Sequence, residues 1–249
     1  MAKASGVLKI EGTVDDLTFY KQNGKNFVRR KGGVSKERIL NDPNFVRTRE
    51  NGAEFGHSAN SGKLLRGAVG SFVFKAKDSK LSSRLMQKMS VVKNFDTVSA
   101  RGSRNVATGI GTPQGKLVLK GFDFNINAEL NSVLFAPVVV TTATGVIKIN
   151  NLIPAEQMQF PQGATHFSLQ GAFLKLDFAT GVSDIKFSNV VNLPINFISA
   201  TSTLTPTAVP VGTGVSFYLL LISFYQLING VQYGLKNEEY NVLNVLEVV

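Results

Sequence analysis

Glu54 and His57 have a spacing that is known from metal sites. The Glu-x-x-His spacing would place both side chains on one face of a helix, as in the dinuclear sites of helical bundles. Such a site needs a second copy of the motif and two further Glu, and Gly56 weakens the helix that would carry it. The chain has two His and no Cys, which excludes thiolate zinc sites and cysteine nucleophiles. We interpret His57 as a surface or capping residue.

The other patterns in the sequence also lack the groups that catalysis needs. His166 stands in an alternating, strand-like segment with no second His or Cys near it in the sequence. The chain has no Gly-x-Ser-x-Gly motif of a hydrolase, and the glycine-rich residues 109–113 lack the Lys-Ser/Thr pair of a phosphate-binding loop. We therefore expect a non-enzymatic protein, and we assign no catalytic, cofactor-binding or metal-binding residue.

Basic residues are concentrated in the first half of the chain. Residues 1–110 contain 21 Lys and Arg against 9 Asp and Glu, whereas residues 111–249 contain 6 against 8. A basic surface of this kind attracts phosphate backbones or the acidic surface of another protein. The candidate residues for binding nucleic acid, another polyanion or a neighbouring subunit are Arg29, Arg30, Lys31, Lys77, Lys80, Arg84 and Lys88.

Turn and helix signals indicate how the first 100 residues position these side chains. An Asn-Gly dipeptide between two short apolar runs predicts a β-hairpin over residues 17–30. An Asp-Pro pair predicts a short helix over residues 43–50. Apolar residues at helical spacing predict two amphipathic helices, over residues 63–76 and 81–92. Residues 1–100 are therefore expected to form a basic N-terminal arm and a helical region.

The pattern changes in the second half of the chain. Residues 101–115 are rich in Gly and have no apolar periodicity, which predicts a linker. Apolar and polar residues then alternate, beginning with residues 116–125, and turn clusters separate the alternating runs. This pattern predicts an antiparallel β-sandwich over residues 116–249, with the hairpin of residues 216–235 in its interior. The expected fold class is mainly β, and α+β overall.

Three segments of the N-terminal region resemble a known group of proteins. They are the sequence GTVDDLTFYK at residues 12–21, KGGVS at residues 31–35, and NDPNFVRTRENGAEFG at residues 41–56. They are similar to hypothetical proteins from Bacteroidota. The resemblance covers about the first quarter of the chain. It implies no catalytic residue, because no established activity attaches to that group.

The sequence leaves three classes of function open. The first, which we favour, is a non-enzymatic structural protein that assembles with copies of itself into a virion-like or coat-like particle, a filament or an appendage. Long apolar strands support it, because they exceed what one small sheet face must bury. The alternatives are an architectural nucleic-acid-binding protein that uses the basic half, and a β-sandwich that is a ligand-binding module or a hydrolase without a recognisable motif.

The sequence also bears on the place of synthesis. The longest apolar stretch, residues 215–228, is shorter than the roughly 20 residues that a membrane-spanning helix needs. The first twelve residues lack the apolar run of a classical signal peptide. We expect cytoplasmic synthesis, compatible with later incorporation into a particle, and no membrane span.

Overall fold

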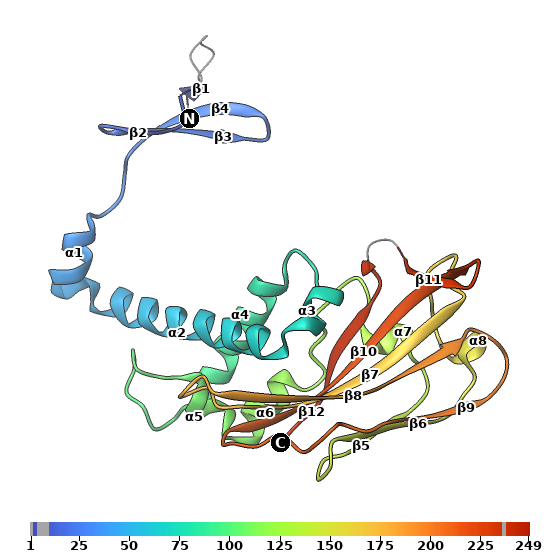
Figure 1. Ribbon diagram of the computed structural model, residues 1–249. Helices are drawn as coiled ribbons and strands as arrows, with labels where there is room; N and C mark the ends of the chain where they lie inside the picture. The colour runs from blue at the N-terminus through green and yellow to red at the C-terminus, as the bar shows by residue number, and fades with distance from the viewer. Residues whose placement is uncertain (1, 4–9, 236–237) are drawn as a thin grey trace. The chain divides into compact units, whose positions relative to one another are not determined.

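The computed structural model describes residues 2–3, 10–235 and 238–249 (Figure 1). The chain divides into two compact units, Met1–Arg49 and Glu50–Val249. This division falls well before residues 101–115, where the linker was predicted. The reason is that the helices after residue 50 pack on the same apolar core as the strands of the large sheet.

The first unit contains a small antiparallel sheet with the strand order β1-β4-β3-β2. Its strands are β1 (Ala2–Lys3), β2 (Gly12–Val14), β3 (Leu17–Gln22) and β4 (Lys25–Arg30). β3 pairs with β4 over its whole length, which confirms the predicted hairpin. Asn23 and Gly24 have the positive φ angles that its tight turn requires. Between residues 10 and 49, which the structure describes in full, no side chain is buried.

Helix α2 is longer than the predicted helix over residues 43–50. The chain passes through α1 (Lys36–Asn41) and the 3-10 helix η1 (Pro43–Phe45) into α2 (Val46–Val69). Asp42 accepts a hydrogen bond from the Asn44 backbone and caps η1, as its position before Pro43 predicts. The predicted end near residue 50 is wrong because α2 continues through a stretch rich in Gly and Ser. Polar residues in the middle of α2, beginning with Glu54, take the buried positions there.

The second unit contains the rest of α2 and several shorter helices. They are α3 (Ser71–Lys75), α4 (Leu81–Lys93), α5 (Val106–Ile110), α6 (Pro113–Leu119), α7 (Leu130–Val133) and α8 (Pro154–Gln157). The break between α3 and α4 lies where the sequence predicts it, close to Asp78. In the part of the chain that the structure describes, no helix combines the length and the apolar character needed to cross a bilayer.

Two antiparallel sheets complete the second unit, so the fold is α+β. The large sheet has the order β11-β10-β7-β8, and β12 also pairs with β10. Its strands are β7 (His166–Leu176), β8 (Ser183–Pro194), β10 (Val215–Ile228), β11 (Val231–Gly234) and β12 (Val242–Val248). The small sheet has the order β5-β6-β9. Its strands are β5 (Val138–Thr141), β6 (Val146–Leu152) and β9 (Ala200–Leu204).

Strand β10 is buried on both faces because different layers cover them (Figure 1). Leu219 and Leu221 belong to the core that the large sheet shares with helices α2 to α6. Leu220 and Ile222 belong to a second core, which contains residues of β6 and β9. The interior position predicted for residues 216–235 is therefore correct for most of β10. It is wrong for the hairpin tip, where β10 ends and β11 lies exposed.

Residues 101–115 are part of the fold and do not form a linker. They contain α5 and the start of α6, and Val106 and Ile110 are buried against α4. Asp96 accepts hydrogen bonds from the backbone of Val98, Ser99 and Asn105, which holds the connection that leads into α5. The loop composition that suggested a linker reflects close helix packing instead.

The alternating residues 116–125 do not form the predicted strand. Their first part completes α6, which ends at Leu119. Their second part is extended and pairs with β12: the backbones of Gly121 and Phe124 donate to Val245 and Leu243. The alternation therefore indicates an extended segment over a few residues only, at the outer edge of β12.

Replacing Gly109 with Ala is expected to destabilise the protein by about 2–3 kcal/mol. A Cβ at this position would clash with the backbone carbonyl of Val92 in α4, which cannot move away without disturbing its helix. Gly56→Ala is the matched control, because Gly56 is also helical and has no atom within 4 Å of that position. The control should stabilise the protein by roughly 0.5–1 kcal/mol. Urea unfolding measures both, and equal effects would contradict the close packing of α4 and α5.

Candidate functional site

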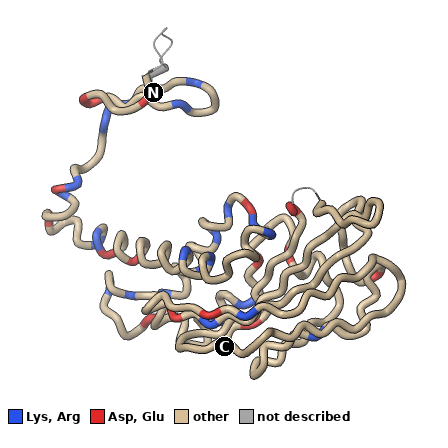
Figure 2. The backbone as a smooth tube through the Cα atoms, viewed as in Figure 1, with Lys and Arg blue, Asp and Glu red and all other residues tan. Residues whose placement is uncertain are grey.

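The predicted basic residues lie in both compact units. Arg29 and Arg30 are the last residues of β4, Lys31 follows them, and all three are exposed. Lys77 and Lys80 lie in the connection between α3 and α4, on either side of Asp78, and Figure 2 shows basic and acidic positions close together there. Arg84 and Lys88 follow on α4 and complete the predicted set. The seven residues therefore form one set on the N-terminal unit and another on the helical layer of the second unit.

Arg84, a member of the predicted set, makes several contacts inside the protein. Its guanidinium donates to the backbone oxygens of Asp123 at 2.8 Å and of Phe124 at 3.1 Å. It also forms an ion pair with Asp78 and lies over the ring of Phe122. These contacts fasten α4 to the extended segment that pairs with β12. Of the predicted helical pair, only Lys88 faces solvent.

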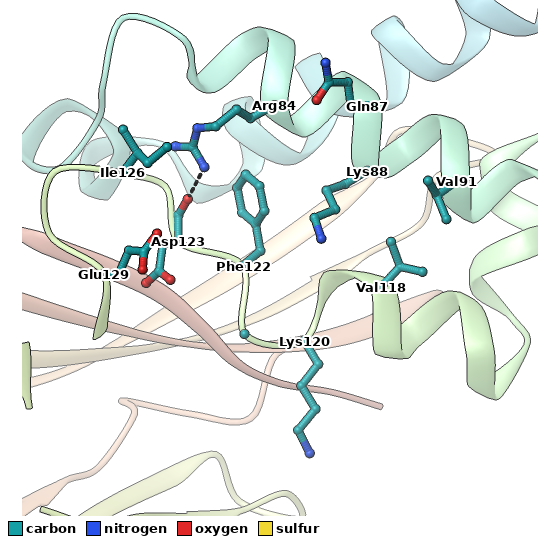
Figure 3. Close-up of a pocket in the computed structure, with 11 residues that line it drawn as sticks. Arg84, Gln87, Lys88, Val91, Val118, Lys120, Phe122, Asp123, Ile126 and Glu129 are labelled. Atoms are coloured by element: carbon teal, nitrogen blue, oxygen red, sulfur yellow. Dashed lines mark hydrogen bonds between the residues drawn. The ribbon is translucent and has the colours of Figure 1, made fainter. Parts of the chain in front are cut away.

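Arg84 and Lys88 line a hollow of about 440 Å³ between α4 and residues 118–129 (Figure 3). The hollow contains cations and carboxylates together. Lys120, at its rim, forms an ion pair with Glu247 at 2.5 Å. Asp123 and Glu129 lie in the lining opposite Lys88. Because the charges compensate one another, this hollow has no clear electrostatic preference for a polyanion.

Asp123, which lines this hollow, has a raised pKa. Burial raises the pKa of Asp123 above its ordinary value, and the nearby Glu129 adds to the effect. One of its oxygens accepts hydrogen bonds from the Leu130 backbone at 2.9 Å and from the Asn244 side chain at 2.8 Å. Asp123 therefore joins the start of α7 to β12, and this structural role accounts for its position.

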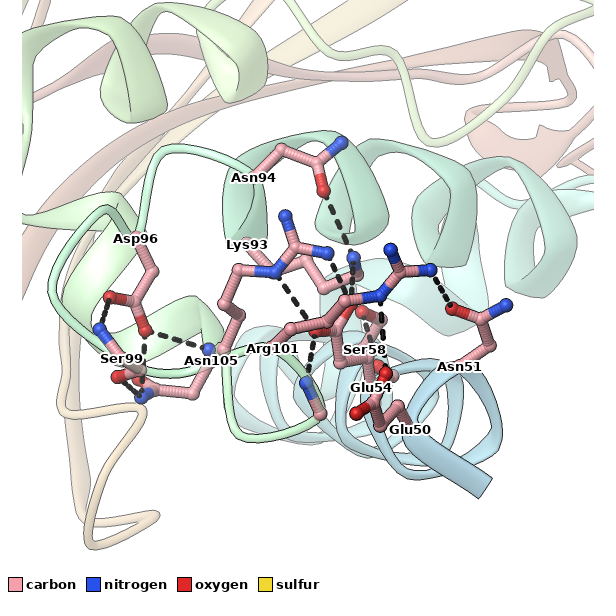
Figure 4. A network of polar contacts seen from close by, with 12 residues as sticks. Glu50, Asn51, Glu54, Ser58, Lys93, Asn94, Asp96, Ser99, Arg101 and Asn105 are labelled. Atoms are coloured by element: carbon pink, nitrogen blue, oxygen red, sulfur yellow. Dashed lines mark hydrogen bonds and ion pairs between the residues drawn. The ribbon is translucent and has the colours of Figure 1, made fainter. Parts of the chain in front are cut away.

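Glu54 is the centre of a polar cluster in the second unit (Figure 4). Its side chain is only 3% exposed. Arg104 donates to both carboxylate oxygens, at 2.8 and 2.9 Å, and Lys93 donates at 2.6 Å. The Gly102 backbone adds a hydrogen bond at 2.8 Å. The hydrogen bonds from Arg104, and then those from Lys93 and Gly102, lower the pKa of Glu54 to about 2.

This cluster gives Glu54 a role that the Glu-x-x-His spacing did not indicate. Its carboxylate is fully engaged by cations and backbone, so it joins α2 to α4 and to the connection before α5. His57 is half-buried on α2, and no hydrogen-bond partner reaches its buried Nδ1 among the residues described. No sequence signal links Glu54 to Lys93 and Arg104, because both lie about 40 to 50 residues away.

His166 occupies the strand position that its alternating surroundings predict. It is the first residue of β7, and its Nδ1 lies 3.0 Å from the hydroxyl oxygen of Thr165. Across the described ranges, no group of three or more His, Asp or Glu side chains is arranged to hold a metal ion.

Comparison of the chain with protein-family models, with curated proteins and with solved structures finds no match.

Proposed function

We propose that the protein is a non-enzymatic structural subunit that assembles with copies of itself, and that its N-terminal unit is the arm that joins one copy to the next. The observation that carries this proposal is the absence of any buried side chain between residues 10 and 49. A small sheet needs a covered apolar face to be stable in water, because burial must offset the entropy of ordering its strands. The arm therefore needs a partner surface.

Apolar side chains of the arm favour a protein as that partner. Six of them are between 41% and 54% exposed: Ile10, Val14, Leu17, Val34, Leu40 and Val46. A phosphate backbone would neutralise the Lys and Arg of the arm but would leave these side chains in water. Another protein surface can cover both kinds of residue.

A second copy of the chain provides a suitable surface. Six apolar side chains on β8, on the connection before it and on the connections from β8 to β9 and from β9 to β10 are between 51% and 75% exposed: Val182, Val190, Phe197, Ile198, Val209 and Val211. Each copy would thus contribute an uncovered arm and uncovered apolar side chains along β8 and near its two ends, which could cover each other in an assembly. In this proposal the two sheets of the second unit act as the predicted β-sandwich, and their shared core supports that arrangement.

The charge of the arm supports the same arrangement. The arm contains eleven Lys and Arg against five Asp and Glu. Glu238 and Glu239 are exposed on the second unit and are available to a neighbouring arm. Asp184 is less suitable, because it already forms an ion pair with Lys186 at 2.8 Å.

Replacing both Leu17 and Leu40 with Glu in the full chain is expected to dissociate the assembly. Both side chains are exposed within the arm, so the change should leave its own contacts intact while it removes apolar contacts with a partner. The loss of two buried Leu side chains should raise the dissociation constant by roughly 100-fold or more. Native mass spectrometry and electron microscopy of the purified protein measure the change.

The matched control is the double variant Val91→Glu and Leu117→Glu. These residues are exposed on α4 and α6 and lie outside both apolar sets. The control should assemble like the unchanged protein. A protein that stays monomeric at high concentration, or equal losses for the two double variants, would overturn the proposal.

A further inference from the structure

A groove of about 530 Å³ lies between the last turns of α2, helix α3 and the start of α4. Lys63, Arg66, Phe74 and Lys77 are among the residues that line it. All of them belong to the second unit, and the groove is separate from the hollow beside Lys88. None of its lining residues belongs to the arm that carries the proposed assembly function.

The groove has an excess of positive charge. Within residues 10–235 and 238–249, no carboxylate forms an ion pair with Lys63, Arg66 or Lys77. Asp78 is the acidic residue of the lining, and its oxygens are already occupied. One accepts from the Lys80 backbone, and the other accepts from Ile126 and from Arg84. Three cations are therefore left to attract an anionic ligand.

Phe74 adds an aromatic platform to this basic groove. Its side chain is 74% exposed, although its neighbours Phe72 and Val73 are buried in the core. The Lys77 ammonium lies 4.9 Å from the centre of the Phe74 ring. The ring does not contribute to the core, and most of its surface is open to solvent. An open aromatic ring beside several cations is the arrangement by which proteins bind single strands, with a base stacked on the ring.

We infer that this groove binds single-stranded nucleic acid, with phosphates next to Lys63, Arg66 and Lys77 and one base stacked on Phe74. A duplex fits less well, because its bases are stacked on each other and cannot reach the ring. An acidic peptide would use the cations but not the aromatic surface. Because every base has a stacking face, the groove should bind with little sequence preference.

The test measures binding of a fluorescently labelled oligothymidylate to the full-length protein by anisotropy at several salt concentrations. Phe74→Ala should weaken binding about 5- to 100-fold, whereas Phe74→Tyr keeps the ring and should bind like the unchanged protein. The triple variant Lys63→Gln, Arg66→Gln and Lys77→Gln should reduce the slope of log affinity against log salt by about 2, at roughly 0.7 per lost phosphate contact.

A second triple variant, Lys88→Gln, Lys148→Gln and Lys175→Gln, removes the same charge elsewhere in the second unit. It should change affinity much less than the first. Equal losses for the two triple variants would show attraction to net charge alone and would overturn the inference. Duplex binding as tight as the single strand and unaffected by Phe74→Ala would also overturn it. Displacement of the labelled oligonucleotide by thymidine monophosphate as strong as by unlabelled oligonucleotide would overturn it too, because the ligand would then be a free nucleotide.

Discussion

Glu54→Ala is expected to destabilise the protein by about 3–5 kcal/mol, because Lys93 would remain buried without its carboxylate partner. Urea unfolding of the full chain measures the loss. The matched control is Glu50→Ala, one turn earlier on α2. Glu50 pairs with Arg101 at 3.3 Å, but the Arg101 side chain is half exposed, so this change should cost less than about 1 kcal/mol. Similar losses for the two variants would contradict a buried ion-pair cluster.

The same variant has a second readout in the dependence of stability on pH. The pKa of Glu54 is about 2 in the folded protein, below its ordinary value of 4.5. A carboxyl group with a lowered folded pKa stabilises the protein fully above its unfolded pKa. This contribution is lost as the pH falls from about 4.5 towards 2. Glu54→Ala should therefore lose less stability than the unchanged protein over that range. Parallel curves of unfolding free energy against pH for the two proteins would contradict the lowered pKa of Glu54.

Leu219→Ala and Leu220→Ala should each destabilise the protein by about 2–5 kcal/mol. The two residues are consecutive in β10 and point to opposite faces of the sheet, yet both are fully buried. Val231→Ala on β11 is the control, because Val231 is half exposed in the same sheet and lies outside the proposed assembly surfaces, so the change should cost less than about 0.5 kcal/mol. Denaturant midpoints compare the three variants. If only one of the two Leu variants were destabilised, one face of β10 would be open to solvent.

Local chemistry explains which elements could be predicted from the sequence. The hairpin of β3 and β4 depends on Asn23 and Gly24, because these two residue types tolerate the positive φ angles that a tight turn requires. The apolar length of β10 likewise predicts a buried strand. Neither pattern indicates what covers a buried face, so the helical layer over one face of the large sheet was not predicted.

Glycine is the clearest example of a signal with two meanings. Gly109 and Gly115 resemble residues of a flexible linker, but each allows another backbone to pass where a side chain would stand. Only the neighbours in space distinguish these two uses, and Val92 lies in another helix. The domain boundary was misplaced for this reason.

Charge in the sequence predicted a basic surface but not the use of each cation. Arg84 belonged to the predicted set, yet its partners Asp123 and Phe124 lie about 40 residues later in the chain. Lys63 and Arg66 were not in that set. A signal did exist for Phe74, because it falls outside the apolar spacing that predicts the helix over residues 63–76.

The pairing of β12 with the segment before α7 also affects how fast the chain reaches its fold. Lys120 meets Glu247, 127 residues later, and Asn244 meets Asp123 across 121 residues. Closing loops of that length costs entropy before any contact forms to offset it. Chains dominated by such distant pairings fold on a scale of milliseconds to seconds, far more slowly than helical bundles. Until β12 docks, the apolar edge of β10 stays open to other chains, so the yield of refolding should fall as protein concentration rises.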